Sequence, residues 1–316
     1  MSTAADPASN ADVGHVPSGP HRLSAREWFA ALKRTVKEFL ADDCMGLSQQ
    51  VAFGSLLAFF PSVILLVGLL GLIGAYEDLK TFLGTIAPGA VIDAIDLAQE
   101  TAAGNKASST VAVVIGLFAA VWAASGAMNA VIRAVNVAYD RIETRPFWKV
   151  RIYAIVLVFA TGLTLAGVLV LIVFGGPLGE AIASRAHLGG AWDWIWNILR
   201  WPLAFCGVLL FFALVYYLAP NVDQRNWTWV TPGSLVGAIL WLALSGLFSL
   251  YTSFSSSYDK TYGSLAGGII LLLWLNYSAM ALLFGAELNA ELDRQADIDA
   301  SGDPRAGLIG YARRNR

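Results

Sequence analysis

The apolar residues of this chain fall in blocks that are long enough to cross a lipid bilayer. A helix rises about 1.5 Å per residue, so the hydrocarbon core requires about 20 apolar residues. Only 14% of the residues are charged, against about 25% in soluble domains. The sequence therefore predicts an all-α, polytopic membrane helix bundle with six transmembrane helices. The expected spans are residues 51–75, 110–131, 152–174, 201–218, 232–251 and 263–285.

The two ends of the chain lack such blocks. Residues 1–23 are rich in Ala, Ser, Pro, Gly and Asp, a composition typical of a disordered tail. We expect residues 293–316 to form a second flexible tail. Residues 24–292 are then a single transmembrane domain.

A short amphipathic helix is expected before the first span. Ser24 and Glu27 have the spacing of a capping box, in which each side chain satisfies a free backbone N–H. Apolar side chains then recur at helical spacing, with basic residues beside them: Trp28, Leu32, Val36 and Phe39. The helix either lies on the cytoplasmic membrane surface or packs on the other helices, and the sequence alone favours neither.

The basic residues orient the predicted spans. Of the 21 Lys and Arg residues, 16 fall on the side that holds both termini. Loops with an excess of Lys and Arg stay in the cytoplasm. We therefore expect both termini to be cytoplasmic.

The residue types of metal and catalytic sites are scattered. Cys44 and Cys206 lie far apart in the sequence, and the three histidines fall in expected tail or loop positions. We therefore expect no metal, no cofactor and no catalytic residues. The formal net charge of -2 gives no reason to expect a nucleic-acid partner.

Polar residues within the spans are the candidates for function, because hydrocarbon penalises polar groups that are neither paired nor hydrated. One face of the second span is predicted to carry Ser125, Asn129, Arg133 and Asn136. One face of the sixth is predicted to carry Asn276, Met280, Leu283 and Glu287.

Arg133 and Glu287 both lie near the cytoplasmic ends of their helices, so we expect them to face each other or to line one cavity. Two alternatives stay open: a purely structural ion pair, or an Arg133 side chain that extends to lipid phosphates. Gln50 opens the first span and is a further substrate-pathway candidate. Pro61 removes a backbone hydrogen bond within that span and predicts a kink.

Several strings together resemble the YihY/BrkB family of membrane proteins. They include AFGSLLAFFPSVILLVGLLGL at Ala52–Leu72, NVAYDRIETRPFWKVR at Asn136–Arg151 and LRWPLAF at Leu199–Phe205. The last two begin at Thr231 (TPGSLVGAILWLALSGLFSLYTSF) and at Ser257 (SYDKTYGSLAGGIILLLWLNYSAMALLFGAELNAEL, ending at Leu292). The resemblance covers most of the chain, from about Phe39 to Leu292.

The resemblance implies a multi-pass protein of the bacterial inner (plasma) membrane with about six spans. It also implies that the family's historical ribonuclease BN label is a misassignment. We expect a transporter or flippase-like protein whose partners are membrane lipids and whose substrate is a lipid or an envelope precursor. A non-catalytic envelope scaffold is the alternative, and a ribonuclease is disfavoured because no His and carboxylate cluster supports it. The oligomeric state stays open.

Overall fold

The computed structural model describes residues 25–72, 106–173, 175–186, 191–222, 230–254 and 265–301, and within these ranges every regular element is a helix. The elements are α1 (Ala25–Ala41), α2 (Cys44–Leu72), α5 (Lys106–Ala138), α6 (Phe147–Val173), α7 (Gly175–Ala186), α8 (Ala191–Leu218), α9 (Pro232–Phe254) and α11 (Leu265–Ser301). The all-α prediction is confirmed for this part of the chain.

Five helices in the described ranges are long and apolar enough to cross a membrane. Their candidate spans are Leu117–Ala138, Phe147–Ile172, Trp194–Leu218, Pro232–Thr252 and Gly267–Gln295, which correspond to the second to sixth expected spans. The apolar stretch found in α2, Cys44–Phe59, is shorter. The first span therefore remains a prediction, as does a bend at Pro61, although α2 continues through that proline.

Two boundaries differ from the sequence-based expectation. α8 begins at Ala191, ahead of the expected start at residue 201, because tryptophans bind its first turns to α7. The indole N–H of Trp192 donates to the Gly179 carbonyl at 3.0 Å, and that of Trp196 donates to the Gly175 carbonyl. Pro202 therefore lies inside the helix and not in its first turn.

α11 also extends further than expected. It continues to Ser301, so the chain is helical past the position where a tail was expected to begin. Polar contacts support this extension: Arg34 on α1 donates to Gln295 at 2.8 Å, and Arg294 pairs with Glu291 at 3.3 Å. The flexible tail predicted for residues 293–316 is thus wrong for its first part, and its remainder lies outside the described residues.

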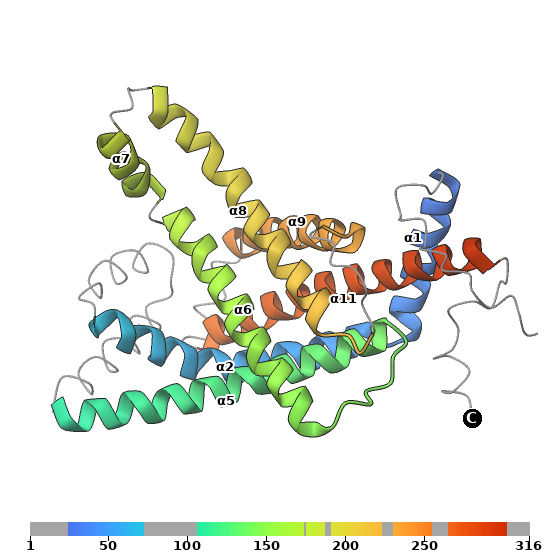
Figure 1. Cartoon of the computed structure of the whole chain (residues 1–316), viewed down its shortest axis with the longest axis horizontal. Helices are drawn as coiled ribbons and strands as arrows, with labels where there is room; N and C mark the ends of the chain where they lie inside the picture. Colours follow the sequence, from blue (N-terminus) through green and yellow to red (C-terminus); the bar gives the residue numbers. More distant parts are fainter. Residues whose placement is uncertain are drawn as a thin grey trace, which may run out of the picture.

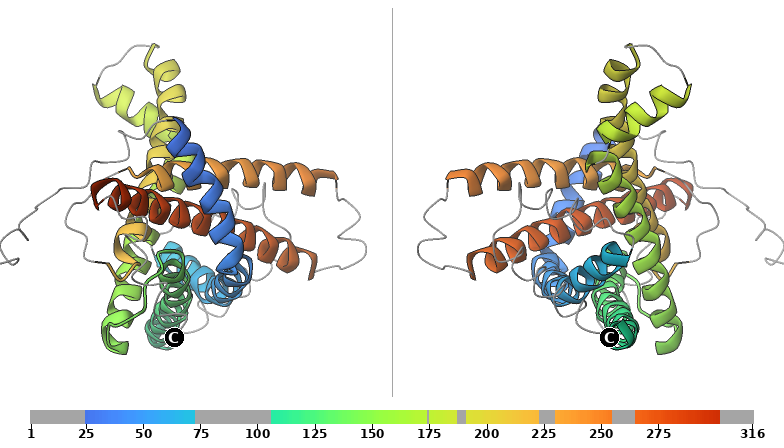
Figure 2. Two further views of the ribbon diagram at one scale, coloured as in Figure 1. Left: turned by 90° about the vertical axis from the view of Figure 1, so that its right-hand side faces the viewer. Right: turned by 90° about the vertical axis from the view of Figure 1, so that its left-hand side faces the viewer.

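The long helices pack as three pairs, α2 with α5, α6 with α8, and α9 with α11. In Figure 1, α2 and α5 lie side by side, and α6 and α8 rise together with α7 at their far end. Figure 2 shows α9 beside α11, and α1 crossing the end of α11. The three pairs meet near the ends of α5 and α8 and the middle of α11, and they point in different directions from there (Figure 1).

The largest buried cluster lies where the three pairs meet, and we call it the junction core. It combines the last turns of α5 and α8 with the first turns of α6 and the middle of α11, as in Val135, Leu157, Tyr216 and Leu283. Away from the junction core, large apolar side chains are exposed, including Phe118 on α5, Leu163 on α6 and Leu247 on α9. Exposed apolar surface on this scale is typical of helices that face lipid.

α1 packs against α11 through one face. Ala31 forms a small buried cluster with Leu288 and Leu292 of α11, and Arg34 pairs with Glu291 at 2.6 Å. This contact corresponds to the second of the two arrangements expected for the amphipathic helix. A different face of α1 stays exposed and apolar, formed by Phe29, Leu32, Val36 and Leu40.

Candidate functional site

Glu287 lies beside the junction core and is an ionisable side chain that is only 2% exposed. It lies on α11 within the candidate span Gly267–Gln295. The thiol of Cys44 donates a hydrogen bond to its Oε1 at 3.3 Å. In the described part of the chain, no Lys or Arg forms an ion pair with it.

A tight turn between α1 and α2 places Cys44 beside Glu287. Asp43 has a φ of 51°, and its carboxylate accepts the Gly46 amide at 3.3 Å, as a helix-capping side chain does. Burial raises the pKa of the Cys44 thiol, and the negative charge of Glu287 raises it further. Cys44 therefore stays a thiol and remains available as a donor.

Three further carboxylates lie within electrostatic reach of Glu287: Asp42, Asp140 and Glu291. Glu291 is compensated by Arg34 at 2.6 Å and by Arg294 at 3.3 Å. Glu287 thus lies where α1, α2, α5 and α11 meet, and its surroundings are acidic.

The turn after Glu287 attaches α11 to the start of α9. The side-chain oxygen of Asn289 accepts the Gly233 amide at 2.8 Å, and its side-chain nitrogen donates to Thr231 Oγ1 at 3.0 Å. A Cβ at Gly233 would collide with the Gly285 carbonyl, so the two helices approach each other at backbone distance. Asn289 was not predicted as a site residue, although it lies in the GAELNAEL string.

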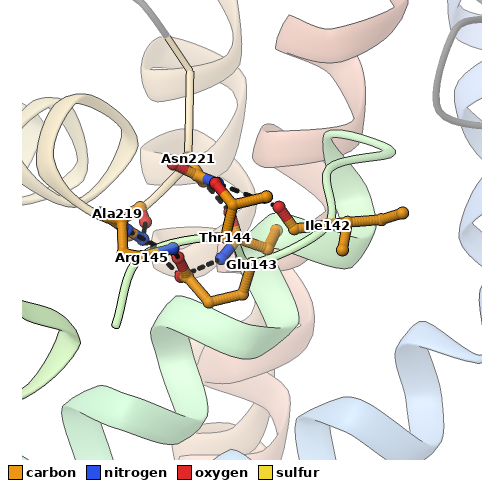
Figure 3. Close-up of polar contacts among 7 residues, drawn as sticks. Ile142, Glu143, Thr144, Arg145, Ala219 and Asn221 are labelled. Carbon is orange, nitrogen blue, oxygen red and sulfur yellow. Dashed lines mark hydrogen bonds and ion pairs between the residues drawn. The ribbon is translucent and has the colours of Figure 1, made fainter. Parts of the chain in front are cut away.

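A second polar group joins the α5–α6 loop to the end of α8, and we call it the loop cluster: Asn136, Glu143, Thr144, Arg145 and Asn221. Arg145 pairs with Glu143 at 2.7 Å and donates to the Ala219 carbonyl at 2.9 Å (Figure 3). Asn136 donates to Glu143 at 2.9 Å and accepts the Asn221 amide at 2.7 Å. Asn221 donates to the Ile142 carbonyl and to Thr144, each at 2.9 Å (Figure 3).

The loop cluster also sets the ionisation of Glu143. Partial burial opposes its charge, but the hydrogen bonds and positive charge of Arg145, together with the Asn136 amide, outweigh burial and lower the pKa of Glu143. Because three of its members, Glu143, Thr144 and Arg145, come from the ETRPFW string, the cluster gives that string a structural role.

The predicted face of the second span is divided in the structure. Asn136 is 3% exposed, whereas Arg133 is exposed and Asn129 is half-buried. Three residues turn a helix by about 300°, so Arg133 and Asn136 point in directions about 60° apart. That difference is enough to bury Asn136 in the loop cluster and to leave Arg133 exposed.

The expected pairing of Arg133 with Glu287 is therefore wrong within the described residues. Glu287 is buried beside Cys44, and Arg133 lies on the outer side of α5. Gln50 is exposed on α2. Asn276 is half-buried on α11, with its amide nitrogen 3.9 Å from the Met280 sulfur and its carbonyl oxygen buried without a hydrogen bond.

Among the described residues, no group of three or more His, Cys, Asp or Glu side chains could hold a metal ion.

Comparison with known proteins places these sites in a family. The family described as "Virulence factor BrkB" matches residues 35–308, which include Glu287 and the loop cluster. The chain belongs to the BrkB family. A Bacillus subtilis (strain 168) protein named "Putative ribonuclease-like protein YfkH" is 31% identical over 84% of this chain and 96% of its own length.

Other BrkB-like relatives are named as membrane proteins. A UPF0761 membrane protein of Aromatoleum aromaticum is 28% identical over 85% of this chain and 64% of its own length. One of Idiomarina loihiensis is 32% identical over 37% of this chain and 44% of its own length. No solved structure matches the chain. With its apolar helices, this chain is therefore a membrane protein of the BrkB family.

Proposed function

We propose that this protein transports a lipid or an amphiphilic envelope precursor across the bacterial inner membrane, with six spans and both termini in the cytoplasm. One observation carries the proposal: Glu287 is a buried carboxylate within a candidate span, and no cation pairs with it in the described residues. Ionisable residues within membrane helices are expensive and commonly mark substrate or ion pathways.

The position of Glu287 supports this role. It lies where α1, α2, α5 and α11 meet, so a change in its charge acts on α2, α5 and α11 together. Burying a carboxylate costs free energy, so an apolar residue in place of Glu287 would cost the fold little stability. A role in packing alone therefore does not explain a carboxylate at this position. The other proposed pathway residues belong to the same three helices: Gln50, Asn129, Arg133, Asn136 and Asn276.

We do not propose a ribonuclease. The ribonuclease-like name belongs to the Bacillus relative, and RNA cleavage requires a base, an acid and a group that stabilises the phosphate charge. Glu287 cannot act as an acid or a base on RNA, because its carboxylate is buried and accepts a hydrogen bond from the Cys44 thiol. A non-catalytic scaffold is the function that remains if no transport is found.

Reconstituted vesicles test the proposal. The purified chain is placed in vesicles with a fluorescent phospholipid, and translocation is followed by chemical bleaching of the outer leaflet. We expect wild-type protein to exceed protein-free vesicles, and Glu287→Gln to reduce the rate about tenfold. Glu180→Gln is the matched control, because Glu180 is exposed on α7.

The outcomes test the role of Glu287 separately from the transport function. Equal rates for wild type and Glu287→Gln, in protein with unchanged thermal stability, would remove Glu287 from the pathway. Wild-type rates equal to those of empty vesicles, for phospholipids and for polyprenyl phosphates, would overturn transport and leave the scaffold.

A further inference from the structure

One side of α5 is an exposed face, which we call the α5 outer face: Phe118, Trp122, Gly126, Asn129 and Arg133. Their spacings of four, four, three and four keep them in one line along the helix. Phe118 is 72% exposed and Trp122 is 69% exposed. At Gly126, no atom lies within 4 Å of where a Cβ would stand, so the space above the middle of this face is open.

A second arginine reaches this face from the neighbouring helix. The guanidinium carbon of Arg151 on α6 lies 3.9 Å from the centre of the Trp122 ring, and its Nη2 donates to the Trp122 carbonyl at 3.2 Å. Its Nε is buried and makes no hydrogen bond with any described group. The guanidinium of Arg151 is thus held in place by the indole ring and the carbonyl of Trp122, while its Nε–H still lacks an acceptor.

No negative charge on the two helices balances these arginines. The candidate spans Leu117–Ala138 and Phe147–Ile172 contain no Asp or Glu, while they carry Arg133, Lys149 and Arg151. Neither Arg133 nor Arg151 forms an ion pair with a carboxylate in the described part of the chain. Cations at this depth are stable only with a partner or with water.

The two arginines flank the open middle of the face. Trp122 and Arg133 lie about 16 Å apart along the helix axis. Arginine has a long side chain with a forked guanidinium, so Arg151 from one end and Arg133 from the other can approach a group above Gly126 and Asn129. Towards Phe118 the face is purely apolar.

We propose that the α5 outer face binds an anionic phospholipid, with the phosphate above Gly126 between Arg151 and Arg133 and an acyl chain along Trp122 and Phe118. Arginine suits this role because its planar fork donates two parallel hydrogen bonds to a phosphate. The excess of positive charge selects a lipid with net negative charge over a zwitterionic one. The idea that the bound lipid is a transport substrate rests on the function proposed above. The binding of the lipid to this face does not.

Lipid binding to the full purified chain tests this inference at equilibrium, without any measurement of transport. Native mass spectrometry compares phosphatidylglycerol with phosphatidylcholine, titrated into delipidated protein. We expect wild type to prefer phosphatidylglycerol, and Arg151→Gln to lose about tenfold in affinity for that lipid with no change for phosphatidylcholine. Arg133→Gln is expected to lose less, because only the Arg151 guanidinium is held in place on this face, by the Trp122 ring and carbonyl.

Two further variants keep the test decisive. Gly126→Leu leaves every charge in place and fills the open space, so it should abolish the preference even if Arg151→Gln folds poorly. Lys149→Gln removes a basic residue that lies beside the Trp148 ring, 5.4 Å from its centre, and should leave binding unchanged. The inference is overturned if Gly126→Leu keeps the wild-type preference, or if Lys149→Gln weakens binding as much as Arg151→Gln does.

Discussion

At the scale of single residues, the loop cluster shows how a short string can determine where three elements meet. Glu143 accepts from the Arg145 side chain at 2.8 and 2.7 Å and from the Arg145 backbone amide at 2.9 Å, and Arg145 in turn reaches the end of α8. Charge-assisted bonds of this kind are stronger than neutral ones. The negative charge of Glu143 is therefore part of the structure.

This charge predicts a pH dependence of stability. Because the pKa of Glu143 is lowered in the folded protein, its contribution is complete above the ordinary glutamate range and is lost as the pH falls through the lowered value. Glu143→Gln should lower the unfolding free energy by about 1–2 kcal/mol at pH 7. Thermal unfolding in detergent, measured from pH 7 to pH 4, should show the wild type approaching the variant in acid. A difference between them that is constant with pH, or that is matched by Glu180→Gln, contradicts the assignment.

The sequence predicted which residues are polar and deep, but not what they contact. Spacing placed Asn136 on a face with Arg133, and the structure assigns Asn136 to the loop cluster, with partners from the next loop and from α8. Helical periodicity gives directions around one helix. Such partners depend on how helices far apart in sequence are placed, which one sequence does not reveal.

At the scale of elements, long apolar blocks predicted helices well and their ends poorly. α7 and the first turns of α8 are held by tryptophan side chains that donate to backbone carbonyls, and the end of α11 is held by polar pairs. None of these interactions appears as apolar periodicity, so the expected spans stopped where hydrophobicity stopped.

α1 gives a prediction at this scale. Its exposed apolar face, with Leu32 and Val36, lies beside the exposed Lys33 and Lys37, a combination suited to an anionic membrane surface. In a Cys206→Ser background, a nitroxide label at Val36→Cys should be reached better by oxygen, and one at Lys37→Cys better by a water-soluble nickel chelate. The measurement is electron paramagnetic resonance in phosphatidylglycerol vesicles. Equal access of the nickel chelate to both labels would show that the apolar face is in water.

At the scale of the whole molecule, two of the three pairs, α2 with α5 and α9 with α11, join helices that follow one another in the described order, whereas α7 lies between α6 and α8. The junction core is what makes the three pairs one domain. Helices that are close in chain order commonly pack as neighbours, but the packing of one pair on another depends on a few close contacts. One of them lies at Gly285 on α11, where a Cβ would meet both the Tyr216 hydroxyl of α8 and the Gly233 carbonyl of α9.

Gly285→Ala therefore tests whether the junction holds the pairs together. In an open helix position this substitution stabilises by about 1 kcal/mol, because alanine loses less backbone entropy. At Gly285 the methyl group forces α8, α9 and α11 apart, and overpacking of this kind costs about 1–3 kcal/mol. We expect a lower melting temperature for Gly285→Ala, and an unchanged or higher one for Gly246→Ala and Gly268→Ala, which have open space around them. If all three variants melt alike, the contact at Gly285 does not limit stability, and the pairs are held together by the remaining apolar surface of the junction core.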